Sequence, residues 1–301
     1  MKKIAYLGSK PQGLALLKAL HTPNDQWRVI HPEDSKDVRS CLDAFQEYAR
    51  AQMLDLLVAA TPSATDAMLA DFAPDIVFVC GWYWLLKPVV LSRVPMGFWG
   101  AHNSLLPKYR GASPLVWAMI RGEVTVGSTV FRFTPKMDDG PVLHQVCTEV
   151  HRNDHVADVL ERIQERLVAE LPAKWMALLK DEAVLTEQAE REATYCGQRV
   201  PDDGRIDWTG TAAEIRNFIR AQSRPYPGAF TFVDEARVTL WDADEDSRIW
   251  YGTVGQVLAR TPNHVLIQCG GNTALQVIRA ERDGLPVEPR KAFPTIGLRV
   301  I

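Results

Sequence analysis

The chain has 301 residues, of which 47% are hydrophobic and 24% are charged, with a formal net charge of −3 at pH 7. This length predicts two domains, and the near-neutral charge gives no general attraction to nucleic acid or to an anionic membrane. No apolar run approaches the roughly 18 residues of a membrane span, and the five scattered cysteines form no C-x-x-C pair that would suggest a zinc site or a disulfide framework. We therefore expect a globular cytoplasmic protein without a metal site.

Strand and helix patterns alternate in the first part of the chain. Residues 2–8, 26–32 and 75–82 are short apolar runs typical of buried strands, and helical spacing occurs over residues 13–23 and 42–57. This alternation predicts an α/β domain with a mostly parallel, Rossmann-like sheet covered on both faces. Neither G-x-G-x-x-G nor G-K-[ST] is present, so no dinucleotide or P-loop site is indicated.

The middle of the chain continues the pattern with clear boundaries. A strand over 96–102 must end in a turn, because Pro107 cannot continue a strand ladder. A helix follows, with Ser113 as its N-cap and Gly122 at its end. Residues 125–145 then predict a strand, a loop and a second strand, and apolar spacing over 153–179 predicts one long amphipathic helix.

The pattern changes near residue 190. Residues 191–205 are polar and rich in turn-forming residues, as a linker would be, and residues 206–301 contain one short helix followed by short strands separated by Gly, Asn and Asp. We expect a catalytic domain over 1–190, a linker over 191–205 and a small OB-like β-barrel domain over 206–301.

His102 and Asp138 are the two side chains best placed for chemistry. Ligand sites in parallel sheets lie beyond the carboxyl ends of strands, where His102 falls. Asp138 and Asp139 lie in another loop that follows a strand, so we expect a carboxylate to orient and charge the imidazole ring. A structural histidine and a simple acidic turn are the alternatives.

The run H-N-S-L-L-P-K-Y-R-G over residues 102–111, followed by D-D-G over 138–140, resembles the signature of the folate-dependent formyltransferases. That family includes enzymes that act on methionyl-tRNA, on glycinamide ribonucleotide and on amino sugars. The resemblance covers nearly the whole chain, because G-Q-R-V-P-D-D-G-R-I-D-W over 197–208 and R-P-Y-P-G-A-F over 224–230 are similar to the C-terminal part of the tRNA and aminoarabinose enzymes.

The resemblance implies formyl transfer from 10-formyltetrahydrofolate to a primary amine. The formyl oxygen becomes an oxyanion that positioned donors must stabilise. His102 would donate to this oxygen, and Asp138 would raise the basicity of the ring and accept the proton that the amine loses.

The resemblance also suggests binding residues. The folate donor would contact Asp138 and the loop of Trp82, Tyr83, Trp84, Leu85 and Leu86, although this aromatic run is equally consistent with packing. The expected substrate-binding residues are Ser104, Lys108, Tyr109, Arg110 and Gly111, with the alternative that Arg110 braces the turn.

One position departs from the family signature. The family carries an asparagine two residues before the histidine, as a second oxyanion donor, and this chain has Gly100. Asn103 is a candidate replacement if the strand breaks at His102, since adjacent strand side chains otherwise point to opposite faces. An ordered water in the space left by Gly100 is the other candidate.

The charge of the C-terminal part bears on the acceptor. Residues 201–301 contain 12 Lys or Arg and 13 Asp or Glu, and residues 31–45 are acidic and short where the tRNA enzyme has a basic insertion. A polyanion such as tRNA is therefore disfavoured, and we expect a nucleotide-linked amino sugar. An enzyme acting on an amino acid or peptide amine remains an alternative, as do a methionyl-tRNA formyltransferase, a 10-formyltetrahydrofolate hydrolase and a non-catalytic folate-binding homologue. The oligomeric state, including a homodimer, is open.

Overall fold

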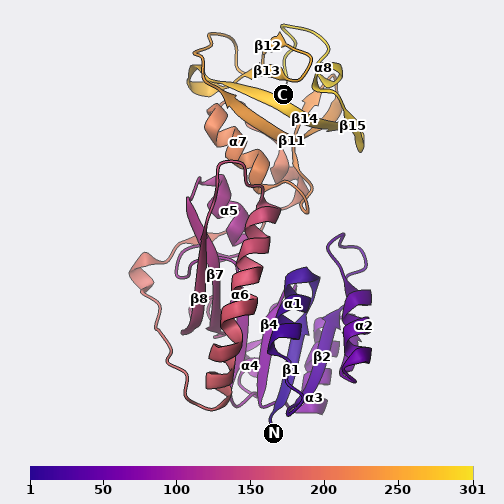
Figure 1. Ribbon diagram of the computed structural model, residues 1–301, viewed down its shortest axis with the longest axis vertical. Coiled ribbons are helices and arrows are strands. Elements are labelled where there is room, and N and C mark those ends of the chain that lie inside the picture. The colour runs from indigo at the N-terminus through magenta and orange to yellow at the C-terminus, as the bar shows by residue number, and fades with distance from the viewer. Residues whose placement is uncertain (301) are drawn as a thin grey trace. The chain divides into compact units, whose positions relative to one another are not determined.

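The computed structural model describes residues 1–300, and the chain divides into two structural units (Figure 1). The first unit comprises residues 1–114, 127–148 and 161–196, and the second comprises residues 115–126, 149–160 and the described residues from Gly197 onward. The two segments 115–126 and 149–160 thus group with the C-terminal part, whereas the predicted catalytic domain includes them. The domain boundaries at 190 and 205 stay a prediction.

A seven-stranded sheet organises the first unit, in the order β3-β2-β1-β4-β5-β7-β8. The four pairings from β3 to β5 are parallel, and β7 joins β5 antiparallel. This confirms the mostly parallel α/β architecture predicted from the alternating patterns. The strands are β1 (Lys3–Gly8), β2 (Gln26–Pro32), β3 (Asp55–Ala59), β4 (Ile76–Cys80), β5 (Phe98–His102), β7 (Thr125–Arg132) and β8 (Val142–Glu149).

Helices lie between the strands of this sheet, and one long helix, α6, follows its last strand. They are α1 (Lys10–Leu20), α2 (Leu42–Ala51), α3 (Pro62–Phe72), α4 (Pro88–Leu91), α5 (Pro114–Ile120) and α6 (Val156–Leu179). The predicted helix over 42–57 is wrong in its last part, because the helix ends at Ala51 and residues 55–57 belong to β3. Met53 adopts a positive φ of 53°, which turns the chain out of the helix so that Asp55 pairs with Arg28 of β2.

Burial follows the apolar patterns. All five residues of β4 are buried, as expected for a strand covered on both faces. The predicted apolar face of α6 is confirmed, because Val156, Val159, Ile163, Leu167 and Leu171 have no exposed surface. Within residues 1–300, no helix is long and apolar enough to cross a membrane.

The second unit contains an antiparallel sheet in the order β10-β11-β14-β13-β12, with β15 paired to β14. The predicted C-terminal β domain is therefore present as an antiparallel sheet, and its closure into an OB-like barrel stays a prediction. The elements are α7 (Ala212–Ala221), β10 (Ala229–Val233), β11 (Ala236–Asp246), β12 (Val257–Arg260), β13 (Val265–Gln268), β14 (Ala274–Arg282), β15 (Leu285–Val287) and α8 (Pro289–Ala292).

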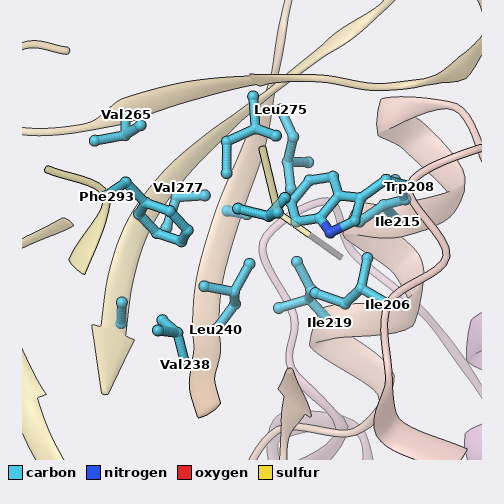
Figure 2. Packing of buried hydrophobic residues seen from close by; sticks show 14 of the residues in the cluster. Ile206, Trp208, Ile215, Ile219, Val238, Leu240, Val265, Leu275, Val277 and Phe293 are labelled. Carbon is cyan, nitrogen blue, oxygen red and sulfur yellow. The ribbon is translucent and has the colours of Figure 1, made fainter. Parts of the chain in front are cut away.

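Helix α7 and this sheet share a hydrophobic core (Figure 2). Ile215 and Ile219 of α7 belong to one buried cluster with Leu240 of β11 and Val277 of β14. The helix begins with a capping box, in which Thr211 accepts a hydrogen bond from the N–H of Glu214 and the Glu214 carboxylate accepts one from the N–H of Thr211.

Candidate active site

Strand β5 ends at His102, and the turn that follows leads into the two-residue strand β6 (Arg110–Gly111). Strand β6 pairs in parallel with β9 (Tyr195–Cys196), a segment more than eighty residues later in the chain. The N–H of Tyr109 donates to the Thr194 hydroxyl at 2.8 Å, and the N–H of Arg110 donates to the Thr194 carbonyl at 2.8 Å. The turn therefore has an outside support that satisfies its backbone.

The loop between β7 and β8 brings Asp138 to His102. Because β7 runs antiparallel to β5, its last residue Arg132 pairs with Trp99 and not with the end of β5. His102 and Asp138 do lie close together, as expected. The cause is the bend of residues 133–141, because β5 and β7 are antiparallel and do not end at the same edge of the sheet. Asp139 is hydrogen-bonded to the Thr134 hydroxyl inside the loop, and Asp138 is the acid that faces the histidine.

The imidazole ring of His102 lies between a carbonyl and a carboxylate. Its Nε2 is 2.9 Å from the Tyr109 carbonyl oxygen, and its Nδ1 is 3.7 Å from Asp138 Oδ2. A carbonyl oxygen only accepts, so Nε2 carries the proton. Nδ1 is then the ring nitrogen that faces the Asp138 carboxylate.

The Asp138 carboxylate also contacts the turn that follows β5. Its Oδ2 accepts a hydrogen bond from the N–H of Gly111 at 2.8 Å. Burial, with a smaller contribution from the charge of Asp138, raises the pKa of the nearby Cys196 thiol to about 11. This thiol therefore stays protonated at neutral pH.

The residues predicted to bind substrate have different surroundings. Ser104 is buried and donates to the Lys108 carbonyl at 2.7 Å, so its hydroxyl closes the turn, while the Lys108 side chain is exposed. Arg110 is 1% exposed, and its guanidinium contacts Glu190 at 2.8 Å and the Tyr195 hydroxyl at 3.1 Å. Burial opposes its charge, but the hydrogen bonds and charges of Glu190 and Tyr195 together outweigh burial and raise the pKa of Arg110. Its geometry favours the bracing role.

The space beside Gly100 is filled, contrary to the expectation that water could occupy it. A Cβ at this position would lie 2.6 Å from Cζ of Phe133 and 2.8 Å from the carbonyl oxygen of Val79. Phe133 follows β7 directly, and its ring also contacts the ring of Phe131. An aromatic ring and a strand carbonyl therefore occupy the place where the signature asparagine would begin.

Asn103 is the nearest amide to His102 along the chain. Its Nδ2 donates to Gln12 Oε1 at 3.0 Å, and Gln12 Nε2 donates to Asn103 Oδ1 at 3.2 Å. Gln12 lies in the first turn of α1, so this reciprocal pair joins the start of α1 to the end of β5. Each amide retains a second N–H that could reach a ligand.

The predicted folate loop, residues 81–87, follows β4. Trp82 and Trp84 contact each other edge-to-face and pack with Leu86 against the hydrophobic core, while Leu85 is 95% exposed. The Tyr83 hydroxyl lies 3.0 Å from Asp34 and 2.8 Å from Asp37, and burial together with these carboxylates raises the pKa of Tyr83.

Two contributors to the site carry no signal in the sequence. Gln188 lies just before the predicted linker, and its side chain contacts Arg110 and the Asp138 loop. Thr194 lies within the predicted linker, and its hydroxyl accepts a hydrogen bond from the N–H of Tyr109 in the turn. Nothing in their local pattern marks them, because their partners are distant in sequence. Among the described residues, no cluster of His, Cys, Asp or Glu is arranged to hold a metal ion.

The chain matches two known protein families over most of its length. Residues 3–174 match the family described as "Formyl transferase", and residues 199–293 match "Formyl transferase, C-terminal domain".

Solved structures with the same fold include WlaRD, a sugar 3N-formyl transferase determined with dTDP and 5-N-formyl-THF. It is 18% identical with a TM-score of 0.67, and the match covers 94% of this chain and 98% of that one. An N-formyltransferase from Helicobacter canadensis, in complex with folinic acid and dTDP-3-aminofucose, is 17% identical with a TM-score of 0.68, over 92% and 99% of the two chains. HypX from Aquifex aeolicus is 17% identical with a TM-score of 0.67, and this chain spans 47% of its length.

Proposed function

Because this chain belongs to the formyl transferase family, we propose that it moves a formyl group from 10-formyltetrahydrofolate to a primary amine, with His102 and Asp138 as the catalytic pair. The observation that carries the proposal is the 3.7 Å approach of Asp138 Oδ2 to Nδ1 of a histidine whose Nε2 is fixed by the Tyr109 carbonyl. This arrangement places one ring nitrogen, Nδ1, beside a carboxylate.

The pair would serve both stages of the transfer. The neutral amine nitrogen attacks the formyl carbon, and the formyl oxygen takes the negative charge. An N–H at Nδ1 of His102 donates to that oxygen, and Asp138 orients the ring and accepts the amine proton, directly or through water. When the carbonyl reforms, the bond from the formyl carbon to N10 of the folate breaks, and N10 takes up the proton.

A second oxyanion donor is needed, and Gly100 cannot supply it. We assign this role to Asn103, whose second amide N–H is not needed for the pair with Gln12. Losing one oxyanion-hole donor typically costs about 10²–10³ in kcat. The variant Asn103→Ala should therefore lose activity on this scale with little change in KM.

The loop over residues 81–87 fits a flat heterocyclic donor. Leu85 and the exposed part of Tyr83 present apolar surface after the carboxyl end of β4, and Trp82 Nε1 is buried without a hydrogen-bond partner among the described residues. An N–H in that state would be satisfied by an acceptor on a bound ligand. These residues would hold the donor, which supplies the activated formyl group.

The proposed acceptor is a nucleotide-linked amino sugar. The nearly neutral charge of residues 201–301 argues against a tRNA surface. Two proteins of similar fold support this choice. One is WlaRD, a sugar 3N-formyl transferase determined with dTDP, and the other is the Helicobacter canadensis N-formyltransferase in complex with dTDP-3-aminofucose.

The test is a mass-spectrometric screen for formylated product with 10-formyltetrahydrofolate and a panel of dTDP- and UDP-linked amino sugars, with methionyl-tRNA and an amine-free control in parallel. We expect a formylated amino sugar, and loss of about 10²–10⁴-fold in kcat in His102→Ala and Asp138→Asn. Formylation of methionyl-tRNA alone would refute the sugar assignment. Formate release without any amine would refute transfer, and full activity of either variant would refute the catalytic pair.

A further inference from the structure

The side chain of Gln188 contacts both loops that carry the catalytic pair. Its Nε2 donates to the Asp138 carbonyl at 2.8 Å and to the Gly140 carbonyl at 2.7 Å. Its Oε1 accepts from Nε and NH2 of Arg110 at 3.2 and 3.0 Å. A primary amide has two N–H donors and one oxygen with two lone pairs, so this side chain uses its full hydrogen-bonding capacity inside the site.

We propose that Gln188 is a positioning residue that holds the Asp138 carboxylate opposite His102. The inference rests on the proposed function of that pair, and neither family match includes residue 188.

The Asp138 loop needs such support because its backbone is unusual. Asp138 adopts a φ of 49°, in the left-handed region that non-glycine residues occupy at a cost. At Gly140, a Cβ would lie 1.8 Å from the Arg132 carbonyl, so the loop is pressed against the end of β7. The two Gln188 hydrogen bonds fix the carbonyls on both sides of this strained bend.

The other half of the Gln188 amide acts on the carboxylate end of Asp138. The Gln188 oxygen accepts hydrogen bonds from Arg110. The next residue is Gly111, and its N–H donates to Asp138 Oδ2 at 2.8 Å. Gln188 thus fixes the backbone of Asp138 directly, and its carboxylate through Arg110 and Gly111. A displacement of about 1 Å in a catalytic group can cost on the order of 10²-fold in rate, so a loosened loop would be visible in kcat.

The substitution Gln188→Glu separates the two halves of the amide. A glutamate still accepts from Arg110, but it has no N–H for the Asp138 and Gly140 carbonyls and places charge beside them. Gln188→Met removes all four hydrogen bonds at similar volume and serves as the second variant. Glu192→Gln is the matched control, because it makes a carboxylate-to-amide change on an exposed side chain of the same segment, whose ion-pair partner is Arg191.

The first measurement is the pair of imidazole ¹⁵N chemical shifts of His102 in the free protein, which reports the carboxylate near Nδ1 and needs no substrate. We expect Gln188→Glu, Gln188→Met and Asp138→Asn to change these shifts in the same direction and Glu192→Gln to leave them unchanged. The double variant Gln188→Glu with Asp138→Asn should match Asp138→Asn alone, because Gln188 acts through Asp138. Unchanged shifts in either Gln188 variant, or additive changes in the double variant, would overturn the proposal.

The second measurement is formyl transfer to the amine found in the screen. Both Gln188 variants should lose about 10²-fold in kcat with KM unchanged, and should add nothing to the loss in Asp138→Asn. If Asp138→Asn keeps full activity, the proposed function fails, while the ¹⁵N shifts still decide the positioning role. If Asp138→Asn is impaired and the Gln188 variants are not, the positioning role fails and the proposed function stands.

Discussion

Replacing Gly100 with alanine would place a methyl group against Phe133 and Val79. The added Cβ would lie 2.6 Å from the ring and 2.8 Å from a strand carbonyl, closer than carbon atoms tolerate. Overpacking of this kind costs about 1–3 kcal/mol. An alanine free of contacts would instead stabilise a strand by about 0.5–1 kcal/mol over glycine. We therefore expect Gly100→Ala to lower the free energy of unfolding by about 1–2 kcal/mol.

The assay is urea unfolding followed by tryptophan fluorescence. Gly197→Ala is the matched control, because a Cβ there has nothing within 4 Å and the change should stay within about 0.5 kcal/mol. Phe133→Leu shortens the ring that meets the new methyl group, so the double variant should recover about 1 kcal/mol of the loss. A Gly100→Ala protein as stable as the wild type, or more stable, would refute the reasoning that Phe133 fills the place of the missing asparagine.

Three further predictions test the structure away from that contact. The hydrogen bond from Arg248 holds the pKa of Asp246 well below its usual range, so this stabilisation is complete above about pH 4 and is lost as pH falls toward the folded-state pKa. Asp246→Asn should cost about 2 kcal/mol of unfolding free energy at pH 7, with the difference from wild type shrinking in acid titrations. Arg110→Met should lower the free energy of unfolding by about 2–3 kcal/mol, because it removes the hydrogen bonds of a buried guanidinium to Glu190, Tyr195 and Gln188. A melting temperature equal to that of wild type would contradict this. Thr211→Ala should cost about 1 kcal/mol by removing the N-cap of α7, measured by chemical denaturation, and an unchanged midpoint would show that the cap contributes nothing.

The local patterns of the sequence predicted most elements of the sheet correctly. Apolar runs marked β1, β2, β4 and β5, and helical spacing marked α1 and α6, because the period of a strand or helix is a property of neighbouring residues. The error in the helix over 42–57 has the same origin. Leu54, Leu56 and Leu57 are apolar in either conformation, and only pairing with β2 selects the strand.

The sequence by itself also indicated His102 and Asp138, because residues 102–111 and the D-D-G of residues 138–140 resemble the formyltransferase signature. Only the tertiary structure decided what surrounds them. Phe133 fills the space at Gly100, and Gln188 holds the Asp138 loop across fifty positions of sequence. Such contacts depend on how a loop bends and where a distant segment returns, and local spacing carries no information about either.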